Sequence, residues 1–111
     1  MALRKPTDAE SKLIAHLLTT GEAVPSAEVD RQSLLVESMN DGGMGSLRLV
    51  PTGMRSKQRF FGARVSSFEF DDEDGVRVLA ALVVDSEGHI YELELFKTDF
   101  TRLKRLPDAY A

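Results

Sequence analysis

The sequence contains no cysteine, no tryptophan and no long apolar run. The absence of cysteine excludes disulfides, thiolate nucleophiles and thiolate metal sites, and it fits a reducing compartment. The longest apolar run, residues 78–84, is far shorter than the roughly 20 residues that a membrane-spanning helix needs. No signal peptide is visible, because a proline and acidic residues precede any apolar segment. We therefore expect a cytoplasmic protein with no membrane partner.

The totals describe an ordinary small globular protein. With 111 residues, 42% of them apolar and 29% charged, the chain fits one domain, residues 1–111, and leaves no room for a second. A domain of this size buries roughly 65% of the surface that its unfolded chain exposes, so one core can stabilise it without covalent staples. The two histidines, His16 and His89, have no metal-ligand spacing and no nucleophile motif beside them. We expect no metal, no cofactor and no catalytic residue.

Charge is distributed unevenly along the chain, although the formal net charge is only −4. Residues 66–95 contain nine acidic residues and one basic residue, Arg77, whereas the remaining segments are net positive. Nucleic acids bind clustered Lys and Arg side chains. The dominant cluster here has the opposite sign, so we expect no nucleic-acid partner. We expect the basic groups at residues 55–64 and 102–105 to balance the acidic half in space.

The first element is predicted to be an amphipathic helix. Thr7 and Glu10 have the spacing of a capping box, in which each side chain accepts a hydrogen bond from the backbone N–H of the other. Gly21 is expected to end the helix in a left-handed conformation. The apolar residues that recur on one helical face are Leu13, Ile14, Leu17 and Leu18.

The remainder of the chain is predicted to form strands joined by short turns. We expect strands at 33–39, 46–50, 60–70, 76–84 and 89–97, with a short helical turn at 26–29 and a docked tail at 98–106. Short turns favour antiparallel pairing, since parallel pairing requires crossovers of a dozen or more residues. The sequence therefore predicts an α+β fold, in which the N-terminal helix packs on an antiparallel, roughly five-stranded meander sheet.

Side-chain parity adds three details. Residues 76–84 are apolar on both faces, so this strand is expected to lie centrally with the helix on one side. In the last strand, Tyr91 is expected to face the core with Leu93 and Leu95. In the strand that begins near residue 60, Phe61 and Phe68 have opposite parity, and a bulge around residues 66–67 would bring both to the core side.

Three stretches together resemble a family of small bacterial proteins of unknown function. They are RKPT at 4–7, MNDGGMGSL at 39–47, and a C-terminal block that includes DEDGV at 72–76 and YELELFKTDF at 91–100. The resemblance covers most of the chain, and it transfers no catalytic residues because the family has no assigned activity. A looser likeness, in size, acidity and α+β character, links the chain to the immunity proteins that neutralise bacterial toxins.

The acidic turn at residues 71–74 is the most conspicuous candidate site. It is not an EF-hand, because a calcium loop placed on Gly75 would begin at Phe70 and end at Ala81, which carry no oxygen ligand. A solvated hairpin turn, a partner-binding patch and a non-standard cation site remain open. The candidate partner-binding residues are Glu69, Asp71, Asp72, Glu73, Asp74, Glu92 and Glu94.

A second candidate is the glycine-rich run at 40–45. It lacks the third glycine of a dinucleotide fingerprint and the Lys-Ser pair of a phosphate loop, so turn formation is the better explanation. Its length and its methionine leave room for a functional loop. The residues of this possible loop are Asn40, Asp41, Gly42, Gly43, Met44 and Gly45.

These observations favour a non-enzymatic protein-interaction module, similar in kind to an immunity protein, whose acidic surface binds a basic protein partner. One alternative is a small hydrolase whose carboxylates converge in a pocket, with at least one raised pKa. Another is a small-ligand-binding domain that uses the glycine loop. The oligomeric state and the identity of the partner are not encoded in any visible motif.

Overall fold

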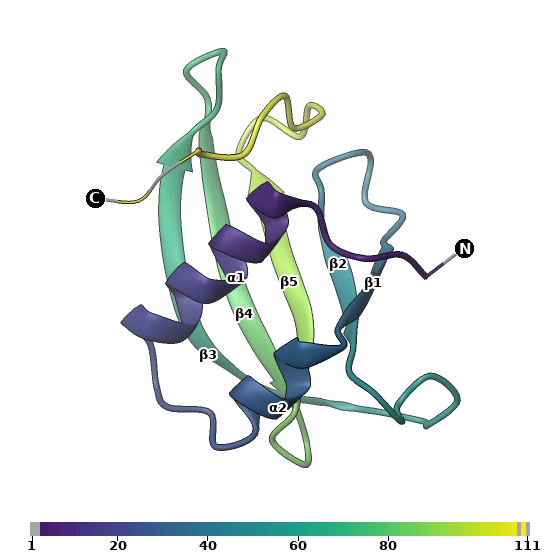
Figure 1. Cartoon of the computed structure of the whole chain (residues 1–111). Coiled ribbons are helices and arrows are strands. Elements are labelled where there is room, and N and C mark those ends of the chain that lie inside the picture. The colour runs from purple at the N-terminus through teal and green to yellow at the C-terminus, as the bar shows by residue number, and fades with distance from the viewer. Residues whose placement is uncertain (1–2, 109, 111) are drawn as a thin grey trace.

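The computed structural model describes residues 3–108 and residue 110, which form two helices and one five-stranded antiparallel sheet (Figure 1). The α+β prediction is thereby confirmed. Among the described residues, no helix is long and apolar enough to cross a bilayer. The elements are α1 (Asp8–Thr20), α2 (Ala27–Gln32), β1 (Leu35–Ser38), β2 (Leu47–Val50), β3 (Phe61–Asp71), β4 (Arg77–Asp85) and β5 (Ile90–Lys97).

The strand order in the sheet is β1-β2-β5-β4-β3, with every neighbouring pair antiparallel. This order departs from a simple meander at one connection, because β2 pairs with β5 and not with β3. Residues 51–60 cross one end of the sheet from β2 to the far side (Figure 1), and β4 and β5 then return by short turns. A connection of this length can span the intervening strands, so a β1–β2 hairpin and a three-stranded β3–β4–β5 meander share one sheet.

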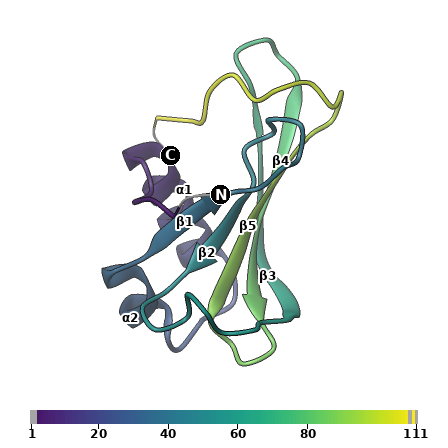
Figure 2. The ribbon, with the colours of Figure 1, turned by 90° about the vertical axis from the view of Figure 1, so that its right-hand side faces the viewer.

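Both helices lie on the same face of the sheet, and the described residues form no second layer over the opposite face (Figure 2). The predicted apolar face of α1 is buried: Leu13, Ile14 and Leu17 are at most 1% exposed. They join a core cluster with residues of the sheet, among them Val78 and Leu82 of β4. The central position predicted for this strand is confirmed, with β3 and β5 on its two sides.

The N-terminus of α1 is held by the predicted capping box. The Thr7 hydroxyl accepts a hydrogen bond from the Glu10 backbone N–H at 3.2 Å, and the Glu10 carboxylate accepts one from Thr7 at 2.8 Å. Arg4 pairs with the same carboxylate at 2.8 Å, and its backbone forms two hydrogen bonds with Val36 of β1. Burial raises the pKa of the Glu10 carboxyl group, but the bonds from Arg4 and Thr7 outweigh this effect. The pKa of Glu10 is therefore lowered. The start of the helix is therefore fixed to the edge of the sheet.

Gly21 ends α1, but not in the left-handed conformation that the sequence suggested. Its φ is −112° and its ψ is −159°, which is extended backbone. Glycine is required here by proximity: a Cβ atom would lie 2.3 Å from the Val65 carbonyl oxygen and 2.4 Å from Ser66 Cβ. The next residue, Glu22, donates its backbone N–H to the same carbonyl at 3.0 Å.

Two irregularities shape β3. The register shifts between Arg64 and Ser66 and again between Phe61 and Ala63. The first is the expected bulge, slightly earlier than predicted, and it allows Phe68 to pack against the core. The second was not expected, and it reverses parity once more, so the prediction that Phe61 faces the core is wrong; its side chain is 52% exposed.

We predict that replacing Gly21 by Ala destabilises the protein. The added methyl group collides with the backbone of β3, and overpacking of this kind typically costs about 1–3 kcal/mol. Urea denaturation followed by circular dichroism measures the change in the free energy of unfolding. The matched control is Glu22→Ala, which keeps the backbone hydrogen bond and should change stability by less than about 0.5 kcal/mol. Equal stability of the two variants would contradict the close approach.

Candidate functional site

The candidate site is the face of the sheet that lies opposite the helices, called here the open face (Figure 2). Strand alternation places on it the residues between those that enter the core. Its charged and apolar residues are Glu37, Arg48, Arg64, Glu69, Asp71, Arg77, Leu79, Glu92, Glu94 and Phe96.

Three apolar side chains form an exposed group at one end of this face, called here the apolar patch: Leu79, Phe96 and Phe100. Leu79 and Phe96 are direct cross-strand partners on β4 and β5, and they are 40% and 38% exposed. Phe100, 70% exposed, follows β5 and sets its ring edge-to-face against Phe96, with 5.2 Å between centroids. Its φ of 64° is uncommon for a residue with a bulky side chain. The tail after β5 therefore adopts a costly conformation that keeps an aromatic ring beside the sheet in solvent.

Ion pairs surround the apolar patch and extend across the open face. Arg48 bonds Glu92 at 2.9 Å, and Arg64 bonds Glu94 at 2.7 Å across the intervening strand. The carboxylate hydrogen bonds raise the pKa of Arg64. Of the basic groups expected to balance the acidic half, Arg64 does so on this face, where five carboxylates accompany three arginines. The third arginine, at the β3–β4 end, forms the pairs Arg77–Glu69 and Arg77–Asp71, both at 2.8 Å.

Tyr91 is buried as predicted, 7% exposed, but it lies outside the core cluster that contains Leu93 and Leu95, and it contacts arginines beside the open face. The β4–β5 register shifts at this residue, so Ile90 enters the core cluster in its place. Two guanidinium groups lie over the Tyr91 ring, that of Arg48 at 4.5 Å and that of Arg59 at 4.9 Å from its centroid. These cation–π contacts add to the ion pairs that the two arginines form with Glu92 and Asp85.

Asp72, one of the candidate partner-binding residues, has no exposed side-chain surface. Its carboxylate accepts hydrogen bonds from the equally buried Lys97 ammonium at 2.8 Å and from the backbone N–H groups of Lys104 at 2.7 Å and Arg105 at 3.0 Å. Burial opposes its charge, but these bonds prevail and lower its pKa to about 2. Asp72 therefore holds the C-terminal tail on the sheet.

The structure places the seven candidate acids in three different environments. Glu69, Asp71, Glu92 and Glu94 lie on the open face, and each is ion-paired there. Asp72 and Asp74 turn inward to the Lys97 ammonium, the latter at 2.6 Å, and this bond lowers the pKa of Asp74. Glu73 stays exposed at the turn, 3.8 Å from Arg105. The acids do not converge on one cavity.

The glycine loop, residues 40–45, is occupied by the protein's own chain. The Asp41 carboxylate accepts backbone N–H groups from Met44 at 3.1 Å and Ser46 at 3.0 Å, which shapes the turn. The tail then docks on it, because Leu103 donates its N–H to the Gly43 carbonyl at 3.0 Å. A Cβ atom on Gly43 would lie 2.9 Å from the Arg102 guanidinium. The C-terminal segment therefore packs on the glycine loop, and the predicted docking of the tail is confirmed.

Sequence analysis missed Lys97, Phe96 and Phe100. A parity signal existed for the first two: Lys97 continues the core alternation of Leu93 and Leu95, and Phe96 continues that of Glu92 and Glu94. Phe100 follows the strand in a turn whose backbone conformation no local pattern specifies. Among residues 3–108 and 110, no group of three or more His, Asp or Glu side chains is placed to hold a metal ion.

A family model described as a domain of unknown function, DUF6984, matches residues 3–107 of the chain. The predicted resemblance to a family without assigned activity is thus confirmed. Neither the curated proteins nor the solved structures contain a significant match.

We predict that Asp72→Asn lowers stability at neutral pH and flattens its acid dependence. Removing one partner of a buried ion pair costs about 3 kcal/mol, because the other charge stays buried. The folded-state pKa of Asp72, about 2, lies below its ordinary value of 3.8. The carboxylate therefore contributes stability that is fully present above about pH 5 and is lost as the pH falls toward 2. Urea denaturation between pH 7 and pH 2 measures both effects.

The matched control for this variant is Glu73→Gln, since Glu73 is the exposed neighbour in the same turn. It should leave the free energy of unfolding within about 0.5 kcal/mol of the natural protein at pH 7. If Asp72→Asn and the natural protein lose stability in parallel between pH 5 and pH 2, the ion pair does not carry the acid dependence.

Proposed function

The chain belongs to the DUF6984 family of unknown function, and we propose that it is a non-enzymatic module that binds a protein partner through the open face of its sheet. The observation that supports this function is a sheet face that carries exposed apolar side chains and that no layer formed by residues 3–108 and 110 covers (Figure 2). Sheets usually bury an apolar face against a second layer, and contiguous exposed patches mark interaction sites.

The apolar patch has the composition of an interface centre. Phe96 and Phe100 are aromatic anchors, and binding energy in protein interfaces concentrates on such residues when a rim of polar groups excludes water around them. Arg64 and Arg77 provide that rim, each already held by carboxylates. Because ion pairs already hold Arg64 and Arg77 in the free protein, these side chains lose little conformational entropy when a partner binds.

The charge of the open face favours a basic partner. Its carboxylates outnumber its arginines, and the exposed Glu73 adds a negative charge beside the β3–β4 end. Complementary charge accelerates encounter and makes the association rate fall with added salt. A toxin that is neutralised by an immunity protein would be one partner of this class.

The two alternative functions receive less support. A hydrolase needs convergent carboxyl groups, one of them with a raised pKa, whereas the acids here are spread along three strands and Lys97 lowers the pKa of Asp72 and Asp74. A ligand site in the glycine loop would compete with Leu103 and Arg102 of the tail.

A site-specific cross-linking experiment in the native host tests the open face. A photoreactive phenylalanine analogue replaces Phe96 in one variant and Val29 in another. Val29 is the matched control, because it is 72% exposed on α2, on the other side of the sheet. We expect a discrete cross-linked protein from position 96 and none from position 29. Cross-links of equal yield from both positions would contradict a specific open-face partner.

With the cross-linked partner purified, we predict that Phe96→Arg weakens its binding by at least 2 kcal/mol, about thirtyfold, as expected for an aromatic anchor. Stability should change little, since Phe96 is outside the core cluster. Titration calorimetry measures the affinity, and stopped-flow fluorescence measures the association rate as salt is raised. If Phe96→Arg leaves the affinity unchanged, the open face is not the binding surface. If the association rate does not depend on salt, the partner is not basic.

A further inference from the structure

The helical face carries a groove that is chemically opposite to the open face. It runs between α1 and α2 and consists of two adjoining hollows of about 360 and 550 Å³ that share Pro6, Arg31 and Leu34. One hollow continues along α1 past Lys12 and Ala15, and the other continues along residues 32–35 into β1. Small-molecule sites have volumes of roughly 300–1,000 Å³, so each hollow matches a small ligand better than a whole protein surface.

The floor of the groove is apolar. Ile14 and Leu34 line the first hollow and Leu34 also the second, but both are core residues, 1% and 7% exposed, so the more exposed Pro6 and Ala15 supply much of the apolar surface there. Pro6 and Ala15 are half-buried beside them. An apolar chain placed here would remove this surface from water and would leave no backbone polar group of its own unsatisfied.

The rim of the groove is positive. Lys5, Lys12 and Arg31 line it, and no acidic residue does. Within residues 3–108 and 110, neither lysine has a carboxylate within ion-pair distance, although Asp8 lies one helical turn before Lys12. Arg31 reaches only Glu28, at 3.9 Å, and that side chain is 87% exposed. Three cations therefore surround an apolar floor without an equivalent number of bound anions.

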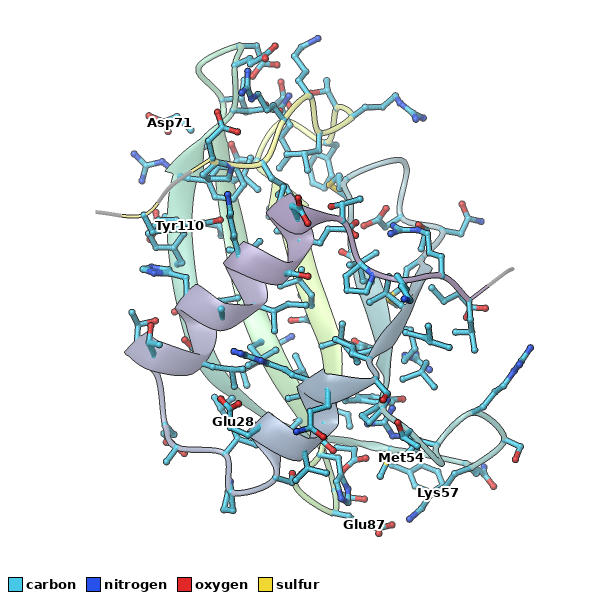
Figure 3. The ribbon with its side chains drawn as sticks, in the orientation of Figure 1. Glu28, Met54, Lys57, Asp71, Glu87 and Tyr110 are labelled. Carbon is cyan, nitrogen blue, oxygen red and sulfur yellow. The ribbon has the colours of Figure 1, made fainter. Side chains whose placement is uncertain are left out.

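A second hollow with basic residues is neutralised to a larger extent. The hollow beside the β2–β3 loop is lined by Glu37 and by Arg48, Arg55, Lys57 and Arg59, of which Arg48, Lys57 and Arg59 pair with Glu92, Glu87 and Asp85. Figure 3 shows Lys57 and Glu87 at the same end of the molecule, where their side chains bond at 2.9 Å. Three of the four basic residues that line this hollow are thus paired with acids, whereas Lys5 and Lys12 of the α1–α2 groove are not.

We infer that the α1–α2 groove binds a small amphiphilic anion, namely a carboxylate carried on an apolar chain. The apolar chain lies over Ile14 and Leu34, and the carboxylate accepts hydrogen bonds from the ammonium groups of Lys5 and Lys12 or from the Arg31 guanidinium, whose charge strengthens them. This groove is separate from the open face, so the inference does not depend on whether the proposed protein partner exists.

Binding of decanoate, below its micellar concentration, tests this inference. In two-dimensional NMR spectra of the ¹⁵N-labelled protein, we expect saturable amide shifts at residues 11–15 and 31–35. The neutral 1-decanol has the same chain without the charge, and it should bind on the order of tenfold more weakly, because it lacks the charge-assisted hydrogen bonds. Absence of decanoate shifts at these residues overturns the inference. So does binding of an acidic, apolar peptide at the groove when decanoate does not bind.

Matched variants separate charge from shape. Lys5→Glu with Lys12→Glu should weaken decanoate binding by about tenfold or more, because attraction becomes repulsion at the rim. Arg55→Glu with Lys104→Glu makes the same change in net charge on exposed residues outside the groove, and it should leave the affinity within about twofold. Ala15→Trp fills the groove without altering charge and should abolish the amide shifts, with the circular dichroism spectrum confirming the fold. Equal affinities for the two charge variants would overturn the inference.

Discussion

The fold depends on one buried ion pair at the end of β5. Lys97 has no exposed side-chain surface, and its ammonium donates to Asp72, to Asp74 and to the Arg102 carbonyl at 2.8, 2.6 and 3.0 Å. A buried ammonium is tolerated only when all of its donors are satisfied, and three acceptors meet that requirement. The pair joins three segments that are distant in sequence, namely the β3–β4 turn, the last strand and the C-terminal tail.

This ion pair also influences the far edge of the sheet, where β1 and β2 lie. Asp72 also holds the tail through two backbone N–H groups, and the tail in turn covers the glycine loop between β1 and β2. Tyr110, labelled in Figure 3, stacks on His16 of α1 with 4.4 Å between ring centroids. Asp72, Asp74 and the glycine loop thus serve packing, whereas the acids of the open face belong to the binding surface that we propose.

Local pattern predicted most of the architecture, for physical reasons that can be named. The capping box at Thr7 and Glu10 depends on residues three positions apart, and the core stripe of α1 depends on helical periodicity, so both were readable from the sequence. The strand order was not, because the pairing of β2 with β5 depends on contacts between distant segments. Bulges set the faces of Phe61 and Tyr91, and a shift of one residue inverts every side chain that follows it.

The candidate site was predictable only in part. The acids at 92 and 94 were placed correctly on a solvent face by alternation, but their pairing with Arg48 and Arg64 required the third dimension. Asp72 looked like a surface residue because its neighbours are charged, whereas its burial follows from a lysine that occupies a core position 25 residues later. The groove between α1 and α2 has no sequence signal, since its cations come from three separate segments.

The approach of Gly21 and Glu22 to β3 also determines how a second protein can reach this sheet. β3 is an edge strand, and unpaired backbone groups at such an edge would recruit a foreign strand from another chain. The Val65 carbonyl is already occupied by the Glu22 N–H, and at the other edge Arg4 occupies both backbone groups of Val36. Each border is thus obstructed by the protein's own chain near its middle. Continuous β-augmentation is blocked there, which leaves side-chain docking as the open route for an incoming molecule.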